Sequence, residues 1–149
     1  MTEVRFYHLT KKSLEQTLPD LLERVLDLGK KAVIKIADEN AIPDMSKHLW
    51  VCRRNGFYPH GTDGEGHPDH DPLWLTTKDD NPINADTLIL TMGAEAESID
   101  QYKIVCIMLN GHNDNEVKSA RERWKIYKEQ GLELTYWQQS EKGNWEKKA

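Results

Sequence analysis

The densest chemistry in the sequence lies between Val117 and Lys128, where five basic residues accompany one acid. At 100° per residue on a helix, four of the cations fall within about 80° of one another: Lys118, Arg121, Lys125 and Lys128. An apolar stripe borders them, made of Val117, Ala120, Trp124 and Tyr127. Cations on an exposed helix are often only solvated, and Trp124 could simply belong to the core. A solvated face usually mixes both signs of charge, however. The pattern therefore predicts a docking surface for a ligand that is anionic and partly apolar.

A second group of potentially reactive side chains lies in the loop at residues 60–71. Its possible metal ligands are His60, His67, Asp69, His70 and Asp71. Zinc needs three or four convergent ligands in a supported geometry, and these histidines lack the i, i+4 spacing of a helical zinc site. We expect a solvated surface loop and no bound metal. A small metal-dependent enzyme that uses this loop is the alternative interpretation.

Other kinds of active site find little support in the sequence. The first predicted strand is followed by Leu9-Thr10-Lys11-Lys12, which is neither a glycine-rich dinucleotide loop nor a Walker motif. Cys52 is expected on a helix and Cys106 in a buried strand, and no Gly-x-Ser-x-Gly elbow occurs. We therefore expect a non-catalytic protein without a cofactor.

Composition is that of an ordinary globular protein, with 38% hydrophobic and 30% charged residues among 149. Length favours a single domain over residues 1–149, with a polar tail from about residue 140. The net charge of −5 argues against strong, general binding to nucleic acid. No signal-like segment or long apolar run occurs, and two distant cysteines do not form a disulfide framework. These features predict a cytoplasmic protein with free thiols and no membrane contact.

Hydrophobic periodicity predicts alternating strands and helices. Strands are expected at residues 4–9, 32–36, 73–76, 87–92, 103–109 and 132–137, and helices at residues 11–28, 42–52 and 113–130. Ser13 is a candidate cap for the first helix, and Asn113 or Asp114 for the last, which should stop at Gly131. The first helix separates its flanking strands by a length that fits a βαβ crossover with parallel pairing. Residues 53–72 are expected to be mostly irregular. This order predicts a layered α/β fold.

A second aromatic group follows the predicted second helix, with Trp50 at the helix end and Phe57, Tyr58 and Pro59 in the loop. It could be a small satellite core that holds the loop on the sheet. It could equally be an apolar patch for a partner protein, because aromatic residues are enriched at interfaces.

Taken together, these motifs resemble the chi subunit family of bacterial DNA polymerase III. The most specific segment is Ala120-Arg121-Glu122-Arg123-Trp124-Lys125-x-Tyr127 followed by Gly131. Phe6-Tyr7-x-Leu9 in the first strand also fits, and the spacing of Leu49-Trp50 to Phe57-x-Pro59-His60 supports the resemblance independently. The resemblance covers nearly the whole chain in length and element order.

The resemblance implies a three-layer α/β/α sandwich around a largely parallel sheet. It also implies a non-catalytic adaptor that links the clamp loader to single-stranded-DNA-binding protein by gripping the acidic C-terminal tail of that protein, which ends in Phe. Arg121 and Lys125 match tail-binding positions, and Trp124 stands where an aromatic, usually Tyr, is found. Lys118 and Lys128 would add positive charge, while Val117, Trp124 and Leu132 would shelter the terminal ring. Trp50, Phe57 and Pro59 match the surface for a second partner, either the psi subunit or a helicase-like protein.

Overall fold

The computed structural model describes residues 2–11, 13–51, 61–62, 72–79, 81–96, 99–142 and 145–148. Their central element is an eight-stranded sheet with the order β3-β4-β2-β5-β6-β1-β7-β8. The strands are β1 (Glu3–Leu9), β2 (Ala32–Ile36), β3 (Gly61–Thr62), β4 (Leu73–Thr76), β5 (Thr87–Thr91), β6 (Ile104–Asn110), β7 (Glu133–Gln139) and β8 (Trp145–Lys147). The helices are α1 (Leu14–Asp27), α2 (Ala41–Val51) and α3 (Asp114–Glu129).

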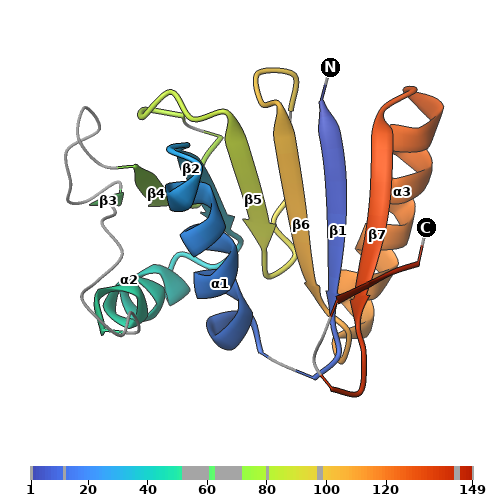
Figure 1. Ribbon diagram of the computed structural model, residues 1–149, viewed down its shortest axis with the longest axis horizontal. Coiled ribbons are helices and arrows are strands. Elements are labelled where there is room, and N and C mark those ends of the chain that lie inside the picture. Colours follow the sequence, from blue (N-terminus) through green and yellow to red (C-terminus); the bar gives the residue numbers. More distant parts are fainter. Residues whose placement is uncertain are drawn as a thin grey trace.

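The helices cover opposite faces of the sheet, with α1 and α2 on the near face in Figure 1 and α3 behind β7. Each face has its own hydrophobic core, because alternate residues of a strand point to opposite sides. Tyr7 and Leu9 of β1 belong to the core beneath α1 and α2. Val4 and Phe6 belong to the core beneath α3. The predicted three-layer α/β/α sandwich is confirmed.

The strand order corrects one prediction. β1 and β2 run in the same direction, but they do not pair, because β5 and β6 lie between them. A βαβ crossover makes its two strands parallel, but later strands of the chain can still insert between them in the sheet. All five residues of β5 are buried, as expected for a strand that sits near the middle of a parallel sheet. The resulting strand order places β7, rather than β2, beside β1.

Local chemistry explains where α1 begins. The Ser13 hydroxyl accepts a hydrogen bond from the Gln16 backbone N–H, and the Gln16 side chain accepts one from the Ser13 N–H. This capping box starts the helix at Leu14, three residues later than the predicted start at residue 11. Pro19 is accommodated inside the helix.

Two short strands were missing from the sequence prediction. β3 lies within the loop at residues 53–72 and pairs with β4. β8 lies within the predicted polar tail and pairs antiparallel with β7, so that Trp137 faces Lys147 and Gln139 faces Trp145. Trp145 also packs edge-on against Tyr7, with ring centroids 5.1 Å apart. The one aromatic residue of the tail thus attaches it to the sheet.

Candidate functional site: a basic and aromatic surface on the last helix

The last helix is fixed at both ends by caps that the sequence predicts. The Asn113 side chain accepts hydrogen bonds from the backbone N–H groups of Asn115 and Glu116 at 3.0 and 3.2 Å. At the other end Gly131 adopts a φ of 78°, which glycine reaches without strain. The Leu132 N–H then donates to the Tyr127 carbonyl at 3.1 Å, as in a Schellman motif. This turn leads directly from α3 into β7.

The inner side of α3 is a structural surface. Ala120 and Tyr127 are buried against the sheet. Val117, Trp124 and Leu132 are partly buried against the same core. Trp124 contacts Phe6 and Tyr136 edge-on, with ring centroids 5.4 and 6.0 Å away. Trp124 is therefore both part of the core and partly available to a ligand.

The outer flank of α3 carries the four cations of the predicted stripe, here called the basic stripe: Lys118, Arg121, Lys125 and Lys128. All four are exposed, and none forms an ion pair with any residue that the structure describes. Arg123, the fifth cation of the helix, is different. It lies on the other flank and forms an ion pair with Glu95. The basic stripe therefore carries four uncompensated positive charges on a protein of net charge −5.

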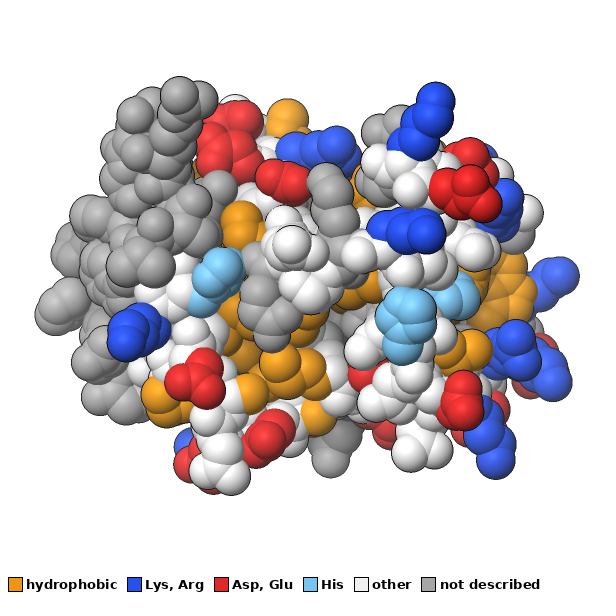
Figure 2. Space-filling view, turned by 90° about the horizontal axis from the view of Figure 1, so that it is seen from below, with side chains coloured by type: hydrophobic (Ala, Val, Ile, Leu, Met, Phe, Trp, Pro, Cys, Tyr) orange, Lys and Arg blue, Asp and Glu red, His pale blue; other side chains and the backbone are white. Residues whose placement is uncertain are grey.

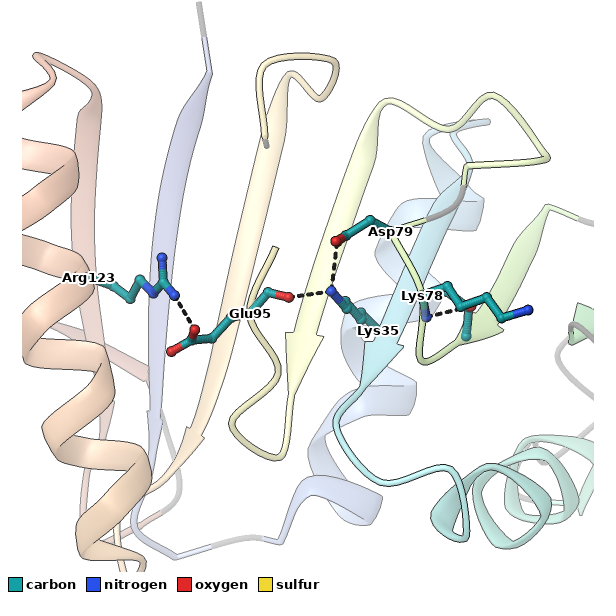
Figure 3. Close-up of polar contacts among 6 residues, drawn as sticks. Lys35, Lys78, Asp79, Glu95 and Arg123 are labelled. Carbon is teal, nitrogen blue, oxygen red and sulfur yellow. Dashed lines mark hydrogen bonds and ion pairs between the residues drawn. The ribbon is translucent and has the colours of Figure 1, made fainter. Parts of the chain in front are cut away.

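Figure 3 shows the polar contacts that hold the Arg123 side chain. The carboxylate of Glu95 contacts the guanidinium, and the Glu95 backbone carbonyl accepts a hydrogen bond from the Lys35 ammonium. Lys35 also binds Asp79, with 2.6 Å between Nζ and Oδ1. This polar chain ties the inner flank of α3 to β2 and to the segment that follows β4.

Two residues that sequence reasoning missed adjoin the basic stripe. His8 Nδ1 lies 2.6 Å from the Tyr136 hydroxyl, and the Tyr136 ring stacks on Phe6 at 6.1 Å. Burial raises the pKa of Tyr136, and the positive charge of Arg121 opposes the rise. Burial also lowers the pKa of His8, and Arg121 and His112 lower it further. His8 and Tyr136 thus stand within the electrostatic reach of Arg121.

Strand alternation was the available signal for these residues. Positions 134 and 136 share a face in the strand predicted at residues 132–137, and Leu134 and Tyr136 both pack on the α3 side. That His8 meets Tyr136 depends on the parallel pairing of β1 with β7. Figure 2, which looks at the carboxyl ends of the strands, shows histidines beside a hydrophobic patch rimmed by Lys and Arg on the right.

The other candidate residues are only partly covered. Trp50 belongs to α2, but its side chain, together with Phe57 and Pro59, lies outside the described residues. The histidines and acids of the loop at residues 60–71 lie outside them too, as does Cys52. Cys106 is buried, and burial raises the pKa of its thiol to about 12, which keeps it protonated at neutral pH. Among the described residues, no group of three or more His, Cys, Asp or Glu side chains could hold a metal ion.

No helix in the described part of the chain is long and apolar enough to cross a membrane. The fold and site together define a class of protein: an α/β sandwich domain that offers a cationic and aromatic surface on its last helix.

Comparison with known proteins gives the family. The model for the family described as "DNA polymerase III chi subunit, HolC" matches residues 1–135, so the chain belongs to the DNA polymerase III chi subunit family. A curated relative, "Probable DNA polymerase III subunit chi" from Rickettsia prowazekii (strain Madrid E), is 27% identical over 103 residues. The aligned region covers 69% of this chain and 62% of the relative. Membership in a family of polymerase subunits supports an accessory role in replication.

Proposed function

We propose that this chain is a non-catalytic adaptor of the replisome that binds the acidic C-terminal tail of single-stranded-DNA-binding protein through α3. The observation that carries the proposal is a set of four cations on one helix flank, none paired with a described residue, beside a partly exposed aromatic wall. An acidic peptide that ends in Phe uses both halves of such a surface. Its carboxylates contact Arg121 and the lysines, and its terminal ring packs against Val117, Trp124 and Leu132.

The second part of the proposal is a link to the clamp loader, or to a psi-like or helicase-like partner, in the cytoplasm. Family membership supports it, and the matching residues are Trp50, Phe57 and Pro59. We expect Trp50→Ala to reduce recovery of this partner in a pull-down and to leave tail binding intact. A Trp50→Ala variant that recovers clamp-loader subunits as well as the wild type does would contradict this interface.

The tail site has a matched pair of variants on one helix. Arg121 belongs to the exposed basic stripe, whereas Arg123 is held by Glu95 on the other flank. Hydrogen bonds to charged groups contribute about 1.5–3 kcal/mol each, so we expect Arg121→Ala to weaken tail binding roughly 10- to 100-fold. Arg123→Ala should change the affinity less than about twofold, because a residue outside the site contributes little to binding.

The measurement is fluorescence anisotropy with a labelled acidic peptide that ends in Phe. We expect a roughly micromolar Kd, or about −8 kcal/mol, that weakens with added salt. A peptide without the terminal Phe should bind less well, because charge attraction alone is screened. Equal affinities for wild type and Arg121→Ala, with both proteins folded by circular dichroism, would show that the site lies elsewhere.

A further inference from the structure

The sheet has a second hollow surface on the face opposite α3. An open groove of about 560 Å³, here called the sheet groove, lies over β1 and β7 between α1 and β8. Tyr7 and Trp137 contribute its floor, and Trp145 of β8 stands at one side. Figure 1 shows this near side of β1 and β7, with α1 standing to one side of it. Within the described residues, no helix covers it.

The two indoles of the sheet groove are held in place and remain partly exposed, whereas Tyr7 is buried. Trp145 packs edge-on against Tyr7 with an interplanar angle of 73°. The Trp137 indole N–H donates to the Thr135 hydroxyl at 3.2 Å, which restricts the rotation of its ring. Two oriented indoles in an open groove are suited to stacking against planar ligands.

The charges of the sheet groove divide into paired and unpaired groups. Arg5 binds Glu3 through two nitrogens at 2.9 and 3.2 Å, so these two charges largely cancel. Arg24 and Lys147 are exposed and form no ion pair with any described residue. Glu133 is the one remaining acid among the residues that line the groove. Two available cations thus accompany two indoles.

We propose that the sheet groove binds single-stranded nucleic acid, with bases stacked on Trp137 and Trp145 and phosphates held by Arg24 and Lys147. Each nucleotide carries a planar ring and a phosphate, and the lining of the sheet groove offers both indoles and cations. A carboxylate such as that of Glu133 can accept a hydrogen bond from the exocyclic amino group of a base. An acidic peptide shares the negative charge of nucleic acid but lacks a planar ring in every unit of its chain. Two free cations make the contact weak and strongly dependent on salt, in keeping with the acidic protein as a whole.

This surface lies on the opposite face of the sheet from the tail site. The family match ends at residue 135, whereas Trp137, Trp145 and Lys147 lie beyond it. Both indoles of the sheet groove and one of its two available cations therefore lie outside that match, whereas the other lining residues lie inside it. Its binding can succeed or fail independently of the tail site on α3.

The test is anisotropy of a labelled oligodeoxycytidine of about eight nucleotides, whose bases carry an exocyclic amino group; this length is within the range that one small single-strand-binding fold covers. It uses the full chain at low salt, followed by a salt titration. We expect the charge reversals Arg24→Glu and Lys147→Glu together, both at exposed positions, to weaken binding tenfold or more and to flatten the salt dependence. Trp137→Phe, which keeps a smaller ring, should weaken it severalfold. Arg121→Ala on the opposite face is the matched control and should leave it unchanged.

Three results would overturn the proposal. The first is no anisotropy change for the oligonucleotide with wild-type protein at low salt. The second is binding that Arg121→Ala abolishes while the double charge reversal keeps it, because the oligonucleotide would then occupy the basic stripe. The third is an acidic peptide that competes for the sheet groove and loses affinity in the double charge reversal, because the occupant would then be a peptide.

Discussion

The ion pair between Lys35 and Asp79 should respond asymmetrically to the loss of either partner. The Lys35 side chain is 11% exposed and that of Asp79 is 37% exposed. Asp79→Ala leaves a nearly buried ammonium with the Glu95 carbonyl as its remaining described partner. Breaking a fully buried pair costs about 3–5 kcal/mol, and the partial exposure of Asp79 reduces the expected cost to about 2–3 kcal/mol.

Lys35→Met keeps most of the buried stem and removes the charge. Asp79 then regains water, because more than a third of its side chain already faces solvent. We expect this variant to lose only about 1 kcal/mol. In a chain of this length each kcal/mol corresponds to about 2–4 °C in Tm, so Asp79→Ala should melt roughly 4–12 °C lower and Lys35→Met roughly 2–4 °C lower.

Urea denaturation of both single variants and of the double variant tests the argument. The double variant should resemble Lys35→Met, because Asp79 contributes little once the ammonium is gone. Tail-peptide affinity should be unchanged in all three variants. The series of polar contacts in Figure 3 reaches α3 through Arg123, which is not part of the basic stripe. Equal costs for the two single variants, or a larger cost for Lys35→Met, would refute the reasoning.

Three further predictions concern the core and the edge of the tail site. Gly111→Ala should destabilise the fold and displace the His8 ring, because a Cβ at this position would lie 2.5 Å from His8 Nε2; NMR of the imidazole would detect it. The pKa of His8 is lowered in the folded protein, so the unfolded chain binds a proton there first as the pH falls. The contribution of His8 to stability is therefore complete above pH 6.5 and is lost as the pH falls through its folded pKa. His8→Gln should therefore lose less Tm than wild type between pH 7.5 and pH 5.5. Leu22→Ala, at a fully buried position, should cost about 2–5 kcal/mol in urea denaturation, against less than about 0.5 kcal/mol for Leu28→Ala, at a position that is 70% exposed.

The helix ends could be predicted from sequence because their causes are local. Ser13, Asn113 and Gly131 each act within a few residues, and the structure confirms all three. The basic stripe is predictable for the same reason, since helical periodicity alone separates Arg121 from Arg123. Only the structure shows that Arg123 is held by Glu95, which is 28 positions away along the chain and reaches it through the tertiary fold.

The strand order could not be predicted because it is decided by contacts between distant segments. The sequence places β1 and β2 on either side of one helix, yet β6 and β7 are the strands that pair with β1. The proximity of His8 to Tyr136 follows from that pairing and has no local signal. β8 was missed because three residues, with one aromatic among them, form too short a pattern to distinguish from a polar tail.

The position of β7 explains how one small domain can offer the two binding surfaces that we propose. Its even-numbered residues Leu134 and Tyr136 face α3 and adjoin the basic stripe. Its odd-numbered residues Thr135 and Trp137 line the sheet groove on the other face. Because the alternation of a strand has a period of two, slipping the β1–β7 register by one residue would exchange these sets and disrupt both surfaces. The two ligands that we propose would therefore be separated by the sheet, and binding of one would not block the other. The proposed adaptor would then hold single-stranded nucleic acid on one face and the tail of single-stranded-DNA-binding protein on the other.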